Sequence, residues 1–261
     1  MATSEPYFGA EVVDRETEAG IVRENRAATL HVVGTAPIHE VHATAEARAP
    51  YINSSIIIRK RDEIEGIFGP PRAGYDIPQY LDALFDQAEE SGIGTIVVTN
   101  VFDPDTHKVN DTPDPAAVTN LDIVGTFDAA SRPSGLKRAY ADFQQFGWFP
   151  KQIAAPSFNM ATGVAAELDV IAHRIRSRYH LDAPLGATVQ QVIEARGVDG
   201  PFDFQTASRR AALCYPQMMV LDTDTASPTA GEAIAEPYSW RHAGVWLRTI
   251  LEHGYHHSPS N

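Results

Sequence analysis

The chain has 261 residues and a formal net charge of −13 at pH 7, with 43% hydrophobic and 21% charged residues. This is the composition of a globular protein, and it excludes a wholly disordered chain, a collagen and a coiled-coil rod. The acidic excess, interrupted by one short basic run at residues 59–61, argues against a partner that is nucleic acid or an anionic membrane. Residues 1–150 contain 12 basic and 23 acidic side chains, whereas residues 151–261 contain 9 and 11, and we interpret the excess as a solvated surface.

Residues 1–26 predict an extended N-terminal arm. They hold nine charged side chains and only short apolar clusters. Ordering the backbone costs roughly 1–2 kcal/mol for each residue. Summed over the arm, this cost exceeds the free energy gained by burying its few apolar side chains. We therefore expect the arm to become ordered only against a partner, as a strand added to the edge of a neighbour's sheet. The apolar side chains that would make this inter-subunit contact are Tyr7, Phe8, Val12, Val13, Ile21 and Val22.

Residues 27–261 predict a single domain in which short apolar strands alternate with amphipathic helices. Strands are predicted at 27–33, 56–58, 95–101, 151–155, 181–185 and 211–221, the last broken at Pro216. Helices are predicted at 64–68, 77–88, 134–147, 164–179, 188–197 and 240–254. Loops are predicted at 38–53, 102–119 and 222–236, and 102–119 is also the place where we expect a small insertion.

Two apolar patterns carry most of the fold prediction. The continuous run at residues 56–58 is typical of a strand buried on both faces. The clearest helix has Val164, Leu168, Ile171, Ile175 and Tyr179 at steps of 4, 3, 4 and 4 residues. Together with the alternation of elements, these patterns predict a layered α/β fold with a mostly parallel or mixed sheet covered by helices.

Motifs of catalysis are missing from the sequence. It contains no glycine-rich phosphate loop, no dinucleotide fingerprint and no nucleophile elbow. The single cysteine, Cys214, is predicted to be a small core residue, and it excludes an intrachain disulfide. His253, His256 and His257 lie close together, but Gly254 interrupts the helix that would align them for a metal.

One alternative to a structural protein stays open at this point. Asp222 and Asp224 follow a predicted strand, where an Asp-x-Asp pair can hold Mg²⁺, although the surrounding Thr and Ser are typical of an ordinary loop. A small-molecule-binding α/β enzyme would bring these aspartates into one pocket with the turn at residues 34–37, which is Gly34, Thr35, Ala36 and Pro37.

Several segments, in order along the chain, resemble the tail sheath proteins of contractile-tailed bacteriophages and related phage-tail-like particles. These segments are 9–13 and 27–36, 53–58 and 62–69, 81–92 and 95–98, 120–125 and 135–137, and 150–156 and 164–176. The sequence departs from the family pattern after residue 98, where Asn100 stands in place of an arginine.

The final residues resemble the family signature Gly-aromatic-x-x-Ser-Pro-Ser-Asn. Its positions here are Gly254, Tyr255, Ser258, Pro259, Ser260 and Asn261. Family members continue past this signature into a C-terminal domain that faces the tail tube. We therefore expect a sheath protein that lacks this domain and that does not build a contractile sheath by itself.

The resemblance implies a structural subunit and not an enzyme. Sheath subunits assemble as stacked rings around the tail tube and contract to drive the tube into the host cell. The implied partners are other copies of the subunit and the tail tube protein, with no nucleic acid, membrane, metal or cofactor. The implied location is the virion, after synthesis in the bacterial cytoplasm, and the N-terminus without an apolar signal segment agrees with this expectation.

Overall fold

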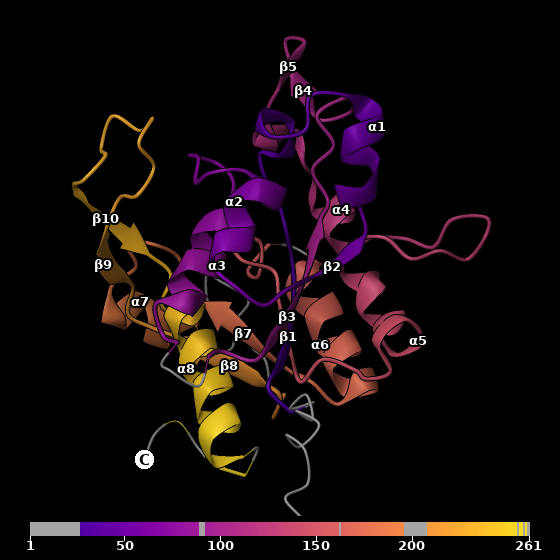
Figure 1. The fold of residues 1–261 in the computed structure, drawn as a ribbon. Coiled ribbons are helices and arrows are strands. Elements are labelled where there is room, and N and C mark those ends of the chain that lie inside the picture. The colour runs from indigo at the N-terminus through magenta and orange to yellow at the C-terminus, as the bar shows by residue number, and fades with distance from the viewer. Residues whose placement is uncertain are drawn as a thin grey trace, which may run out of the picture.

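A six-stranded mixed sheet forms the centre of the computed structural model (Figure 1), which describes residues 27–88, 92–161, 163–195, 208–254, 256, 257 and 259. The strand order is β2-β3-β1-β6-β7-β8. The strands are β1 (Thr29–Gly34), β2 (Ser55–Ile58), β3 (Thr95–Asn100), β6 (Gln152–Ala154), β7 (Arg178–Asp182) and β8 (Ala211–Cys214). All neighbours pair in parallel except β2, which runs antiparallel to β3. The predicted layered fold with a mixed sheet is confirmed.

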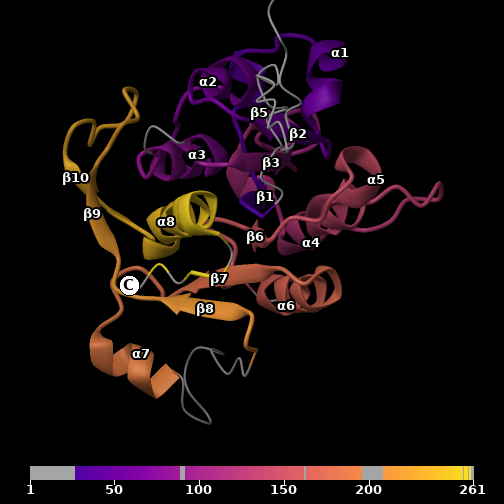
Figure 2. The same ribbon diagram turned by 60° about the horizontal axis from the view of Figure 1, so that its bottom comes forward.

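Helices cover both faces of the sheet (Figure 2). One face packs against α2 (Asp62–Phe68), α3 (Ile77–Phe85) and α8 (Tyr238–His253). The other packs against α4 (Asn120–Val124), the 3-10 helix η4 (Gly135–Tyr140) and α6 (Val164–Ile175). The chain also forms the short helices α5 (Asp142–Phe146) and α7 (Val189–Ala195). The described part of the chain contains no helix that is long and apolar enough to cross a bilayer.

Side chains of the central strands alternate between two apolar cores. Leu30 and Val32 of β1 point toward α3 and α8, where they meet Leu81, Leu84 and Leu247. The first apolar core also contains Trp240 and Ala243 from α8. On the opposite face, Val33, Ile153, Tyr179 and Leu181 contact the apolar stripe of α6, made of Val164, Leu168, Ile171 and Ile175. This period-two division explains why the central strands are apolar on both faces.

Four predicted elements differ from the structure. Residues 56–58 form an edge strand, in which Ile56 and Ile57 are only half-buried because β2 has no strand on its outer side. The predicted loop 38–53 contains three short helical segments, η1 (Ile38–Glu40), α1 (Ala45–Arg48) and η2 (Ala49–Tyr51). The predicted helix 134–147 is divided into a 3-10 helix and the short helix α5, in which Phe143 is 55% exposed. Tyr179 belongs to β7 and not to the preceding helix, which ends at Arg176 in a left-handed conformation.

Two small hairpins lie outside the main sheet. The first, β4 (Lys108–Val109) with β5 (Thr112–Pro113), is followed by η3 (Pro115–Ala117), so the predicted loop 102–119 is a short projecting hairpin at one extremity of the molecule (Figure 1). The second, β9 (Met218–Leu221) with β10 (Ala233–Glu236), corrects the prediction that residues 222–236 are a loop throughout. Its connection, residues 222–232, is polar as expected.

Gly34 ends β1 at a point of close approach to the start of α3. A Cβ atom at this position would lie 2.4 Å from Oδ1 of Asp76, which no real side chain tolerates without movement. That carboxylate in turn accepts a hydrogen bond from the backbone N–H of Thr35 at 2.6 Å. The glycine therefore allows the helix and the strand end to be joined directly.

We expect Gly34→Ala to lower the free energy of unfolding by about 1–3 kcal/mol, the usual cost of overpacking a filled site. Chemical denaturation followed by circular dichroism measures the change. The matched control is Gly66→Ala, because nothing lies within 4 Å of a Cβ atom there and the position is inside α2. The control should stabilise the protein by up to about 1 kcal/mol, and equal losses in both variants would refute the argument from close approach.

Candidate functional site

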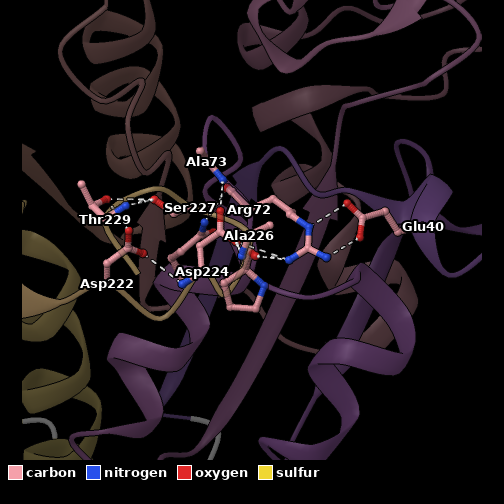
Figure 3. Close-up of polar contacts among 10 residues, drawn as sticks. Glu40, Arg72, Ala73, Asp222, Asp224, Ala226, Ser227 and Thr229 are labelled. Atoms are coloured by element: carbon pink, nitrogen blue, oxygen red, sulfur yellow. Dashed lines mark hydrogen bonds and ion pairs between the residues drawn. The ribbon is translucent and has the colours of Figure 1, made fainter. Parts of the chain in front are cut away.

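Arg72 fastens the connection of the β9–β10 hairpin to the body of the protein (Figure 3). Arg72 donates to both carboxylate oxygens of Glu40, with Nε–Oε1 at 3.0 Å and Nη2–Oε2 at 2.9 Å. Its Nη1 lies 3.3 Å from Oδ1 of Asp224 in the hairpin connection. The backbone N–H of Ala73 donates to Oδ2 of the same aspartate at 2.9 Å. Three segments that are distant in the sequence are thus joined through one guanidinium group and two carboxylates.

The two aspartates of the enzyme alternative, Asp222 and Asp224, accept hydrogen bonds from other residues of the same hairpin connection. Asp224 also accepts a hydrogen bond from the N–H of Ala226 at 2.8 Å. Asp222 accepts from the hydroxyl of Thr229 at 2.7 Å and from the N–H of Asp224 at 2.9 Å. These hydrogen bonds, led by those from Thr229 and Ser227, lower the pKa of Asp222. Both carboxylates are therefore turn-forming and docking groups in this structure.

The turn at residues 34–37 is fastened separately from the aspartates. Thr35 donates to Asp76 through its N–H and its hydroxyl, and Ala36 donates to Oδ1 of Asn100 at 3.0 Å. Asn100 also donates to the carbonyl oxygens of Tyr51 and Phe102, so it organises the carboxyl ends of β1 and β3 together. The residue that departs from the family pattern thus has a clear structural role.

A cavity of about 320 Å³ lies between the β9–β10 hairpin, α3 and α8, and it does not unite the predicted site. Asp222 and Asp224 line it, but residues 34–37 do not. Both arginines that line it form ion pairs with carboxylates of the lining: Arg61 contacts Asp82 and Asp86 at 2.9 Å. Arg241 contacts Asp86 and Glu236, also at 2.9 Å. The arrangement that the enzyme alternative required is therefore absent among these described residues.

Cys214 and the histidines lack the features of a reactive centre. The thiol is buried, its Sγ lies 4.0 Å from Nδ1 of His242, and burial raises its pKa to about 12, so it stays protonated. The imidazole centroid of His257 lies 5.3 Å from that of His253 and 4.6 Å from that of His256. Within the described residues, no three His, Cys, Asp or Glu side chains are placed to hold a metal ion together.

Buried polar pairs, which sequence reasoning did not identify, hold the sheet to its surroundings. His31 on β1 contacts Asp142 at 2.5 Å and Thr99 at 3.0 Å, and the two ring nitrogens are both used. Asp182 at the end of β7 accepts from Asn159 at 2.6 Å and from both the N–H and the hydroxyl of Ser239 at the start of α8. Polar residues inside apolar strands are the signal that could have indicated such pairs.

The residues predicted for assembly lie mostly outside the described residues. This is true of Tyr7, Phe8, Val12, Val13, Ile21 and Val22 of the arm, and of Tyr255, Ser258, Ser260 and Asn261 of the signature. Gly254 is described, and it ends α8 at φ +91°. Several exposed apolar side chains among the described residues lie on the second hairpin and around α7, namely Leu185, Val189, Ile193, Met219 and Leu221. Others lie elsewhere, with Leu121 on α4 the most exposed.

We expect Arg72→Ala to loosen the β9–β10 hairpin. The carboxylate of Asp224, with a side chain only 7% exposed, would lose its charged partner, at a cost of about 1–3 kcal/mol. Hydrogen exchange of residues 218–236 measures local opening of the hairpin, and chemical denaturation measures the free energy of unfolding of the protein. Arg132→Ala is the control, because that arginine pairs with Asp128 on the surface and its loss should cost at most about 1 kcal/mol. Unchanged exchange in the hairpin of the Arg72 variant would contradict the assignment.

We expect Asp76→Asn to flatten the dependence of stability on pH. Burial raises the pKa of Asp76 from its ordinary value of 3.8 to about 7, so the folded state holds the proton more tightly than the unfolded chain. Stability from this proton is present at acid pH and is lost as the pH rises through about 7. Denaturation at a series of pH values should show a smaller loss in the variant between about pH 5 and pH 8.

The exposed Asp128→Asn serves as the control for Asp76, since hydrogen bonds from Arg132 lower the pKa of Asp128 and its effect belongs to more acid pH. Curves for the Asp76 variant and the unchanged chain that stay parallel between these pH values would show that Asp76 does not hold a proton in the folded state.

No family model matches the chain. It is 28% identical to the tail sheath protein of Burkholderia phage BcepMu, over 97% of this chain and 63% of that relative. It is 24% identical to a protein of Pseudomonas aeruginosa strain UCBPP-PA14 described as a prophage major tail sheath protein, over 88% of this chain and 51% of the relative. The chain thus spans between half and two thirds of the length of these curated relatives.

A solved structure shares the fold. The sheath complex of the PVC extracellular contractile injection system, in its contracted state, superposes with a TM-score of 0.52 at 14% sequence identity, covering 98% of this chain and 54% of that chain. The order of matched segments, the similarity over nearly the whole sequence and the shared mixed α/β fold agree with one another. The chain is thus similar in sequence to contractile tail sheath proteins over nearly its whole length, and it shares the fold of a sheath structure.

Proposed function

We propose that this chain is a structural subunit of a contractile tail sheath, and that it assembles with other copies as stacked rings around a tail tube. On this proposal the sheath contracts to drive the tube into a host cell, and the protein is a virion component made in the bacterial cytoplasm. The observation that carries the proposal is the similarity to the BcepMu tail sheath protein over 97% of the chain.

The use of the polar groups supports a structural role over a catalytic one. The carboxylates of Asp222, Asp224 and Asp182 are all held by hydrogen bonds or ion pairs within the fold. A catalytic carboxylate needs a free oxygen directed toward a substrate, and a pKa matched to its task. The described cavity is walled by charged groups that are already paired with one another, as a junction between structural elements would be.

The arm at residues 1–26 is part of this proposal. Its apolar clusters would add to a sheet edge of a neighbouring subunit, with backbone hydrogen bonds supplying affinity and repeated ring contacts raising the effective concentration. The main sheet has two edges to offer among its described strands, β2 on one side and β8 on the other. Two of the four residues of β2 and three of the four residues of β8 are half-buried, so both edges leave part of their length accessible to an added strand.

Incorporation into tails tests the proposed function. Contractile particles purified from cells that produce the full chain should carry it along the whole tail, detected by immunogold labelling in electron microscopy. Deletion of its gene should leave tubes without a sheath made of this chain. Particles with complete contractile tails that lack the protein would refute the proposal.

Substitutions in the arm test how neighbours are joined. We expect Val12→Asp with Val13→Asp to reduce incorporation into tails at least tenfold while leaving the unfolding curve unchanged, because a charge cannot be buried against a neighbour without a partner. Thr3→Asp with Ser4→Asp adds the same charge to the same arm and retains its apolar clusters. Equal incorporation of the two double variants would show that the apolar clusters of the arm do not join the subunits.

A further inference from the structure

Basic side chains gather at the end of the sheet where three parallel strands begin. Lys151 precedes β6, Arg178 opens β7, and Arg210 precedes β8. The strands place them side by side, because the N–H of Arg178 donates to the carbonyl of Lys151 at 2.9 Å and the N–H of Tyr179 donates to the carbonyl of Arg210 at 3.0 Å. The complete group, which we name the basic end, consists of Lys151, Arg174, Arg176, Arg178, Arg209 and Arg210.

The basic end lacks internal neutralisation. Within the described part of the chain, none of its six side chains forms an ion pair with a carboxylate. Arg178 lies over the ring of Trp246 at 4.3 Å, and Arg210 donates to the carbonyl of Ser177 at 3.1 Å. Burial and the neighbouring Arg210 both lower the pKa of Arg178, as expected for cations that are close together.

Several arginines elsewhere in the described structure are paired with carboxylates. Each of a second group contacts at least one carboxylate at 3.3 Å or less, namely Arg48, Arg61, Arg72, Arg132 and Arg241. Asp169 is the acidic residue that most closely precedes Arg174 in the sequence. Its Oδ1 accepts a hydrogen bond from the hydroxyl of Tyr179 at 3.0 Å and lies 3.5 Å from Nε2 of His173. In a chain with a net charge of −13, the basic end thus gathers six cations for which the described residues supply no ion-paired carboxylate.

The opposite end of the sheet, where β1 and β3 end, is acidic. Since β1 and β3 run parallel, the loops that follow them, residues 35–54 and 101–119, lie at the other extremity with the β4–β5 hairpin (Figure 1). These loops hold six acidic and two basic side chains, of which Asp105 and Arg48 pair with each other, and we name them the acidic end. Glu46, on α1, and Asp111, at the tip of the β4–β5 hairpin, are exposed. The protein therefore presents opposite charge at the two ends of its strand direction.

We propose that copies of this chain associate head to tail, with the basic end of one copy docked on the acidic end of the next. The two surfaces are different patches of the same molecule, so the contact is heterologous and each copy keeps one free end for a further copy. Complementary charge orients the two copies and disfavours the reversed pairings, in which like charges would meet. The partner that fits the basic end is thus a second copy of the chain.

For its biological setting the inference rests on the proposed sheath function, in which copies are stacked. The experiment below uses the isolated 261-residue chain, so the head-to-tail contact and the sheath function can be refuted separately. A chain that is absent from tails but associates head to tail in solution would refute only the sheath function. A chain that is present in tails but has no charge-dependent self-association would refute only the contact proposed here.

Sedimentation velocity across a series of protein concentrations gives the first measurement. The average mass should rise with concentration at about 0.01 M salt and fall toward the monomer at about 1 M, because the Debye length shrinks from about 30 Å to about 3 Å. Two double variants each remove one end: Lys151→Glu with Arg209→Glu, and Glu46→Lys with Asp111→Asn. Each should lower the association constant on the order of 100-fold, because complementary charges are lost or like charges then face each other.

Mixing the two double variants gives the decisive measurement. Each keeps the end that the other has lost, so the mixture should form dimers and nothing larger. A contact between identical patches, or one made by the arm, would not produce dimers only on mixing. Gln190→Lys with Glu194→Lys is the matched control, since it changes the charge by the same amount as the acidic-end variant but on α7. The control should associate like the unchanged chain, and monomers at low salt for the unchanged chain would overturn the proposal.

Discussion

Strand β1 is buried along its whole length and paired on both sides, and most of the structure follows from this burial. All six of its residues are buried, with β3 on one side and β6 on the other. Helices must therefore cover both faces, which α3 and α8 do on one side and α6 on the other. The strand also carries His31 into the interior, where an unpaired ring would be costly, and Asp142 and Thr99 occupy both of its nitrogens.

Polar residues at the carboxyl ends of the strands form hydrogen bonds that stabilise the fold. Asn100 joins the loops after β1 and β3, and Asp76 joins the start of α3 to the turn after β1. In many open α/β sheets this edge holds a ligand, because loops separate there and leave a crevice. Here the edge is filled by short helices and by side chains bonded to backbone groups, which agrees with the structural role proposed above.

The parts of the fold that local patterns predicted are those governed by burial period. The stripe of Val164, Leu168 and Ile171 identified α6, and the apolar run at 96–98 identified β3. The edge position of β2 was not predictable, because a triple isoleucine looks the same whether a further strand follows or solvent does. The pairing of Arg72 with Glu40 and Asp224 spans 32 and 152 residues, so no short-range pattern reports it. The predicted assembly residues of the arm lie outside the described residues. The family resemblance rested on the order of many short segments, each of which matches the family only weakly.

The position of α8 in the chain has a consequence for synthesis. Trp240, Ala243 and Leu247 complete the apolar core that α3 begins at Tyr80 and Leu84. A nascent chain emerges from its N-terminal end, at roughly 5–20 residues per second. The side of α3 that packs against α8 therefore stays uncovered until residues 238–253 have been made, whereas β1 and β3 supply the rest of this core earlier. The core on this face of the sheet is thus completed late in synthesis.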